Sequence, residues 1–101
     1  MKKNNVFASV ENAIKDIKAG KMVVVIDDPG RENEGDLVCA AEKVSPEVIN
    51  FMTKYGRGLV CVPMKHKRLE KLGIENMVEQ STEKKCCSFT VSTDYKIGTT
   101  P

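Results

Sequence analysis

The sequence predicts an α/β or α+β fold in which helices flank a mixed sheet. Short apolar runs typical of buried strands alternate along the chain with segments whose apolar residues recur at helical spacing. The chain has 101 residues, which suits a single small domain over residues 1–101. We find no internal repeat and no linker between the segments.

Helix-starting and helix-ending residues set the expected helices. Ser9 and Ser45 are favoured N-cap residues, and Pro46 suits the first turn of a helix. Glycines follow the first two segments and permit the chain to turn away. The predicted helices run between Ser9 and Gly20, from Pro46 to Tyr55 before Gly56-Arg57-Gly58, and over the basic residues 65–72.

Four short segments are predicted as strands. Residues 22–26, 37–41 and 59–62 are apolar without alternation, which is typical of strands covered on both faces. Residues 89–92 alternate between apolar and polar side chains, as in a strand with one wet face. The polar stretch 75–85 is expected to be a loop.

Composition excludes several classes of protein. The net charge is only +2 and basic residues are interspersed with acidic ones, so we expect no nucleic-acid partner. No apolar run approaches the roughly 20 residues of a membrane span, and the start lacks the apolar core of a secretory signal. We therefore expect no membrane partner. A chain this short leaves apolar surface uncovered, so a partner or a dimer is expected.

The cysteines indicate a reducing compartment. None of the four forms a C-x-x-C pair, and His66 is the only histidine, so a zinc site has little support. Cys39 and Cys61 lie inside apolar runs, where a buried, reduced thiol is expected. We expect a cytoplasmic location.

The densest chemical signal is the acidic turn, defined as residues 27–36 with the sequence DDPGRENEGD. It holds five carboxylates and follows directly on a predicted strand. Carboxylates are the hard ligands that Mg²⁺ or Mn²⁺ prefers, and Glu32, Glu34 and Asp36 would share one face of an extended segment. Like charges held close together raise the pKa of at least one carboxyl group, which can then exchange protons near neutral pH. Arg31 can neutralise part of this charge or bind a phosphate.

Each of these signals also has a plainer interpretation. An acidic loop is often a solvated connector whose charges keep it extended. Gly56-Arg57-Gly58 can be only a helix end, although Arg57 can also face a phosphate. Cys61 is most often a core residue, and Thr99 and Thr100 can be a frayed terminus rather than phosphate-binding hydroxyls.

The acidic turn resembles the signature of the 3,4-dihydroxy-2-butanone 4-phosphate synthase family of riboflavin biosynthesis. The resemblance continues through Ala41-Glu42, residues 56–61 and residues 89–94, and so covers nearly the whole chain. The RENEGD core is a highly specific motif in this context. The resemblance implies the N-terminal portion of that α/β fold, in a homodimer that uses Mg²⁺ or Mn²⁺.

The resemblance also implies an activity and a set of site residues. The family converts ribulose 5-phosphate to 3,4-dihydroxy-2-butanone 4-phosphate and formate, as a lyase. Glu32 would bind the metal, and Glu34, Asp36 and Cys61 would be catalytic. The substrate would be bound by Arg31, Glu32, Asp36, Thr99 and Thr100.

The chain departs from the family pattern at its C-terminal end. The family's second metal ligand, a histidine in an arginine-glycine-histidine-threonine segment, and a further glutamate have no counterpart here. The sequence therefore predicts an incomplete N-terminal part of the synthase domain that is inactive alone. The alternatives are a non-catalytic fragment that serves as a dimerisation module and one that only binds cations.

Overall fold

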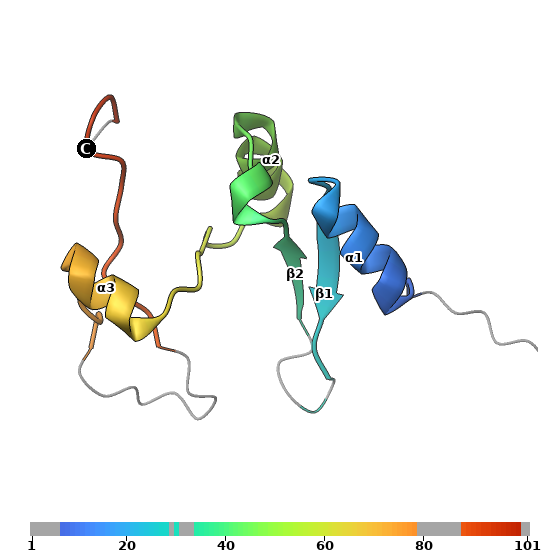
Figure 1. Ribbon diagram of the computed structural model, residues 1–101, viewed down its shortest axis with the longest axis horizontal. Coiled ribbons are helices and arrows are strands. Elements are labelled where there is room, and N and C mark those ends of the chain that lie inside the picture. Colours follow the sequence, from blue (N-terminus) through green and yellow to red (C-terminus); the bar gives the residue numbers. More distant parts are fainter. Residues whose placement is uncertain (1–6, 29, 31–33, 79–87, 100–101) are drawn as a thin grey trace, which may run out of the picture. The chain divides into compact units, whose positions relative to one another are not determined.

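The computed structural model describes residues 7–28, 30, 34–78 and 88–99. These residues fall into two compact units, residues 1–62 and residues 63–101, and each is described by itself (Figure 1). The first unit carries the acidic turn. Three α-helices and a two-stranded sheet are present in the described part, which confirms an α+β mixture.

The first helix of the first unit is α1, Val10–Lys18. Its N-cap is Ser9, whose hydroxyl oxygen accepts a hydrogen bond from the Asn12 amide at 3.2 Å. Gly20 follows the helix with φ of 81°, a left-handed conformation that a side chain would disfavour. Both predicted boundaries of this helix are confirmed, and α1 then packs beside β1 (Figure 1).

A β-hairpin forms the centre of the first unit. Strand β1, Val23–Ile26, pairs antiparallel with β2, Gly35–Val38. The register places Val25 opposite Asp36 and Ile26 opposite Gly35. The second strand therefore begins inside the acidic turn, two residues earlier than the predicted 37–41, because Gly35 and Asp36 already pair with β1.

Short helical segments follow the hairpin. A 3₁₀ turn η1, Ala41–Lys43, precedes α2, Pro46–Phe51, which continues directly into a π-helical turn η2, Met52–Gly56. The Ser45 hydroxyl oxygen caps α2 by accepting from the Val48 amide at 3.2 Å. Arg57 then ends the helix in a left-handed conformation with φ of 59°. The predicted helix over residues 46–55 is confirmed, with its last turn widened.

The second unit contains α3, His66–Leu72, as predicted for the basic segment. Gly73 caps it with φ of 70°. Asn76 and Thr90 form an isolated antiparallel bridge, supported by a hydrogen bond from the Met77 amide to the Phe89 carbonyl at 2.9 Å. Of the strand predicted over residues 89–92, only this bridge forms. The predicted loop 75–85 lies partly outside the described residues.

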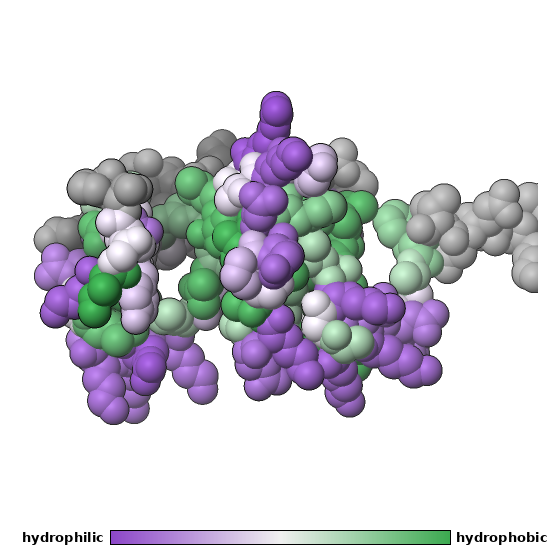
Figure 2. All heavy atoms as spheres, turned by 90° about the horizontal axis from the view of Figure 1, so that it is seen from above, coloured by the Kyte–Doolittle hydropathy of each residue, from purple (hydrophilic) through white to green (hydrophobic). Residues whose placement is uncertain are grey.

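The described residues contain no fully buried side chain. Val24 is 61% exposed and Leu59 is 82% exposed, and apolar side chains lie openly on the face in Figure 2. The expectation that residues 22–26, 37–41 and 59–62 are covered on both faces is therefore wrong for this structure. A two-stranded hairpin and short helices have too little surface to enclose these residues.

The segment 59–62 has no regular secondary structure and forms no strand ladder. Without it, the sheet of the described residues has two antiparallel strands and not the mixed pairing expected from the sequence. The helices and the hairpin of the first unit pack against one another through partly buried residues. They include Ala13, Ile17, Val23, Leu37, Val48 and Met52.

Among the described residues, no helix has the length and apolar character needed to cross a membrane.

Candidate functional site at the acidic turn

Two hydrogen bonds close the acidic turn at its base. The Asp27 amide donates to the Glu34 carbonyl oxygen at 3.3 Å, and the Glu34 amide donates to Oδ1 of Asp27 at 2.9 Å. These residues follow directly on the last pair of the ladder, Ile26 and Gly35. The hairpin register is therefore carried one step further, to Asp27 and Glu34, before the chain leaves the sheet.

Asp36 lies on β2 opposite Val25, so these two side chains share one face of the hairpin. Side chains alternate between faces along a strand. Glu34 directly precedes β2 and is two positions from Asp36, so continued alternation would put both side chains on the same side. Both residues are exposed. Glu34 and Asp36 are thus near neighbours in the chain at the start of β2, and their catalytic roles stay predictions.

The opposite face of β2 is used for packing. Leu37 points toward η2, where a Cβ atom built on Gly56 would lie 3.1 Å from its Cδ1 atom. This contact orients β2 so that Leu37 faces the helical segment and Asp36 faces away from it. Packing therefore selects which side of the strand presents its carboxylate.

Three predicted site residues lie outside the described residues: Arg31, Glu32 and Thr100. The assignment of Glu32 as metal ligand and of Arg31 and Thr100 as substrate-binding residues stays a prediction. Pro29, Asn33 and the cysteines at 86 and 87 lie outside as well.

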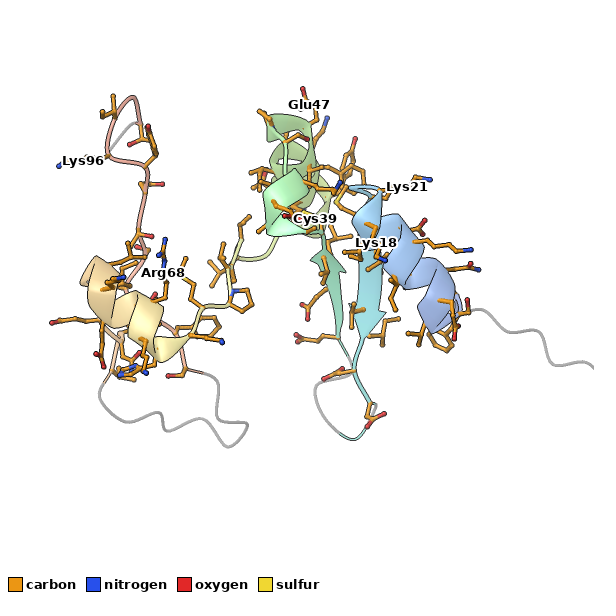
Figure 3. All side chains as sticks on the ribbon, viewed as in Figure 1. Lys18, Lys21, Cys39, Glu47, Arg68 and Lys96 are labelled. Carbon is orange, nitrogen blue, oxygen red and sulfur yellow. The ribbon has the colours of Figure 1, made fainter. Side chains whose placement is uncertain are left out.

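Cys61 belongs to the first unit, in the segment without regular secondary structure that follows Arg57. Its thiol is exposed and donates to the Leu59 carbonyl oxygen at 3.7 Å. The expectation of a buried thiol is wrong here because this segment has no ladder partner in the described part of the chain. Cys39, just after β2, is partly buried (Figure 3).

Thr99 belongs to the second unit. Its hydroxyl group donates to the Tyr95 carbonyl oxygen at 2.8 Å, which holds a local turn around Gly98. Thr99 and the acidic turn belong to separate units. That they bind the same substrate molecule stays a prediction. His66 Nε2 lies 2.6 Å from Oε1 of Glu70 one turn along α3, and both side chains are exposed, as expected for surface residues.

The sequence alone assigns Asp27 no individual role beyond its place among the carboxylates of the acidic turn. A signal was present, because Asp27 and Glu34 are the first residues beyond the apolar strand and before the predicted second strand. Asp is also a residue whose short carboxylate bonds to nearby backbone amides in turns. The pairing of Asp27 with Glu34 could be seen only once the register was known.

The donor set suits a hard divalent cation. Glu34 and Asp36 offer only oxygen atoms, and Mg²⁺ is usually held by one or two carboxylates with waters and substrate oxygens completing its shell. The described residues contain no group of three or more His, Cys, Asp or Glu side chains placed to hold a metal ion. The described residues therefore do not surround a metal ion by themselves. Their carboxylate oxygens suit a site in which water and substrate provide the other ligands.

Comparison with known proteins agrees with these features. The sequence model for the 3,4-dihydroxy-2-butanone 4-phosphate synthase family matches residues 11–101. The riboflavin biosynthesis protein RibBA of Endomicrobium trichonymphae is 79% identical over 98 residues, which are 97% of this chain and 24% of that protein. RibBA of Aquifex aeolicus is 57% identical over 96 residues, which are 93% of this chain and 24% of that protein.

A solved structure is also similar. It is a 3,4-dihydroxy-2-butanone 4-phosphate synthase in complex with two magnesium ions, with 40% identity and a TM-score of 0.78. The match covers 85% of this chain and 40% of that one. The chain spans about a quarter of the length of the curated relatives named above. Because the family match extends over nearly the whole chain, this chain belongs to the 3,4-dihydroxy-2-butanone 4-phosphate synthase family.

Proposed function

We propose that the chain contributes half of the active site of a lyase that converts ribulose 5-phosphate to 3,4-dihydroxy-2-butanone 4-phosphate and formate. The observation that supports this proposal is the β-hairpin. Its paired strands β1 and β2 flank the acidic turn, which carries the family's signature. Asp36 lies on the face of β2 opposite to the one on which Leu37 packs, and continued alternation would put Glu34 on the same side as Asp36.

The reaction requires several proton transfers. A proton next to the ketone must be removed, water is lost, the carbon skeleton shifts, and one carbon leaves as formate. Carboxylates held on one exposed face can serve these steps in turn, because a carboxylate accepts a proton and the resulting acid returns it. We assign these proton transfers to Glu34 and Asp36. Asp36 would also form a hydrogen bond with a substrate hydroxyl group.

Charge complementarity assigns the remaining roles. Arg31 would bind the anionic sugar phosphate through its planar guanidinium group, and Glu32 would bind Mg²⁺ or Mn²⁺. When bound, the cation would stabilise negative charge that develops on the substrate oxygens. Cys61 would line the pocket, and Thr99 and Thr100 would contact the phosphate. We also propose a homodimer for the full-length protein and a cytoplasmic location.

A chimaera provides the direct test. The chain is joined in frame to the rest of the synthase domain of the E. trichonymphae relative, to which it is 79% identical. With ribulose 5-phosphate and Mg²⁺, the chimaera should release formate, and the chain alone should release a negligible amount. Glu34→Gln and Asp36→Asn in the chimaera should each lower kcat by at least about a hundredfold, the usual contribution of a positioned acid or base.

Glu47→Gln is the matched control, since it removes the same charge from an exposed residue in the first turn of α2. Figure 3 places Glu47 beyond the end of β2 that is remote from the acidic turn. Its kcat should equal that of the unmodified chimaera. A folded chimaera without formate release, or full activity in both carboxylate variants, would contradict the proposed function.

A second candidate function follows from the exposed apolar residues, which favour a dimerisation module. Leu59 and Tyr95, for example, are 82% and 73% exposed. Light scattering at several concentrations should show a mass that rises above that of one chain. A well-folded chain that stays monomeric at all concentrations would remove this candidate.

A further inference from the structure

We propose that Asp27 is a positioning residue: its carboxylate fixes the base of the acidic turn by holding the Glu34 amide, and it does so through an oxygen atom and not through its charge. The inference rests on the proposed function for its effect on metal binding. The hydrogen bond itself, at 2.9 Å between the Glu34 nitrogen and Oδ1 of Asp27, does not depend on that function.

The register explains why a side chain is needed at this position. In an antiparallel ladder, a hydrogen-bonded pair exchanges two backbone bonds. The Asp27–Glu34 pair has one, from the Asp27 amide to the Glu34 carbonyl oxygen at 3.3 Å. The Glu34 amide bonds to the Asp27 side chain and not along the ladder. The Asp27 amide thus still bonds to the Glu34 carbonyl oxygen, while the Glu34 amide is held by the Asp27 side chain.

The hydrogen bond joins two residues that are far apart in sequence, so it restrains the whole segment between them. Asp27 and Glu34 are seven positions apart and stand at the two ends of the segment that carries the family signature. A single short bond between them fixes both ends of that segment relative to the hairpin. Asp27 is partly buried, whereas neighbouring Asp28 is exposed.

Substitution with asparagine separates geometry from charge. Asp27→Asn keeps an oxygen acceptor of the same reach but loses the charge, and Asp27→Ala loses both. Mn²⁺ is titrated into the chain and its affinity read from the electron paramagnetic resonance signal of the free ion. Asp27→Ala should weaken binding about tenfold, the equilibrium factor of one such hydrogen bond, and Asp27→Asn should recover most of that loss.

Asp28→Ala is the matched control, because it removes a carboxylate from the adjacent position. Its Mn²⁺ affinity should stay within about threefold of wild type, the range expected for an exposed charge. Equal losses in Asp27→Asn and Asp27→Ala would show that Asp27 acts by its charge and would overturn the proposal. Unchanged affinity in Asp27→Ala would overturn it as well.

Amide hydrogen exchange keeps this test separate from that of the proposed function. The Glu34 amide should exchange about tenfold faster in Asp27→Ala and at the wild-type rate in Asp27→Asn. If the wild-type chain binds no Mn²⁺ but this exchange pattern holds, the positioning role stands and the proposed metal site fails. If the exchange rates of all three chains are equal, the positioning role fails whatever the metal does.

Discussion

Gly56 and Leu37 meet so closely that a methyl group on Gly56 would lie 3.1 Å from Cδ1 of Leu37. This contact joins η2 to β2 and points Leu37 away from the side on which Asp36 lies. The packing of Leu37 on Gly56 therefore covers one face of β2, and Asp36 lies on the opposite face.

Gly56→Ala sets two effects of similar size against each other. Alanine gains about 1 kcal/mol over glycine in a helical turn, while crowding against Leu37 costs about 1 kcal/mol, at the low end for overpacking because a side-chain tip can yield. Gly58→Ala is the control, since no described heavy atom lies within 4 Å of its Cβ position. In urea unfolding, Gly58→Ala should be the more stable variant by about 0.5 kcal/mol. A Gly56→Ala variant at least as stable as Gly58→Ala would show that the contact is loose.

Arg57 is the only residue other than glycine with a positive φ among the described residues, at 59°. A side chain in this left-handed conformation costs about 1 kcal/mol, and glycine avoids that cost. Arg57→Gly should therefore raise the free energy of unfolding relative to Arg57→Ala by about 1 kcal/mol. Thermal unfolding of the two variants would measure the difference, and equal stabilities would contradict the observed backbone conformation.

Ser45 and Ser9 allow two helix caps to be compared. Each hydroxyl oxygen accepts from the amide three residues later at 3.2 Å, and only the Ser45 bond is partly buried. Ser45→Ala should cost about 1 kcal/mol of stability, and Ser9→Ala should cost less because water can replace its bond. Ser45→Asp should restore most of the loss. Circular dichroism during urea unfolding provides the measurement, and a larger effect at Ser9 would reverse this ranking.

Glu32→Gln tests the predicted metal ligand. Removing a charged oxygen ligand should weaken Mn²⁺ binding by at least about tenfold, since even residues outside a metal's first coordination shell have effects of that size. Glu47→Gln, on α2, should leave the affinity unchanged. Equal affinities for wild type and Glu32→Gln in a Mn²⁺ titration would remove Glu32 as a ligand.

Local chemistry made much of this structure predictable. Ser9, Ser45 and Pro46 mark helix starts because their side chains or rings suit those positions whatever lies nearby. The family signature likewise depends only on the order of residues, and the match over residues 11–101 confirmed it.

Strand burial was not predictable in the same way. An apolar run such as residues 59–62 becomes a buried strand only if another strand pairs with it and another layer covers it. Within the described residues neither happens, so Leu59 and Cys61 are exposed in spite of their sequence context.

The sequence by itself determined the family, the helix boundaries and the identity of the acidic residues, because each depends on residues close together in the chain. Only the tertiary structure decided that Asp27 bonds to Glu34 and that Leu37 packs on Gly56. Both contacts depend on a strand register, and a shift of one residue would exchange the faces of Asp36 and Leu37. The register is set by pairing between strands, which the composition of either strand alone does not specify.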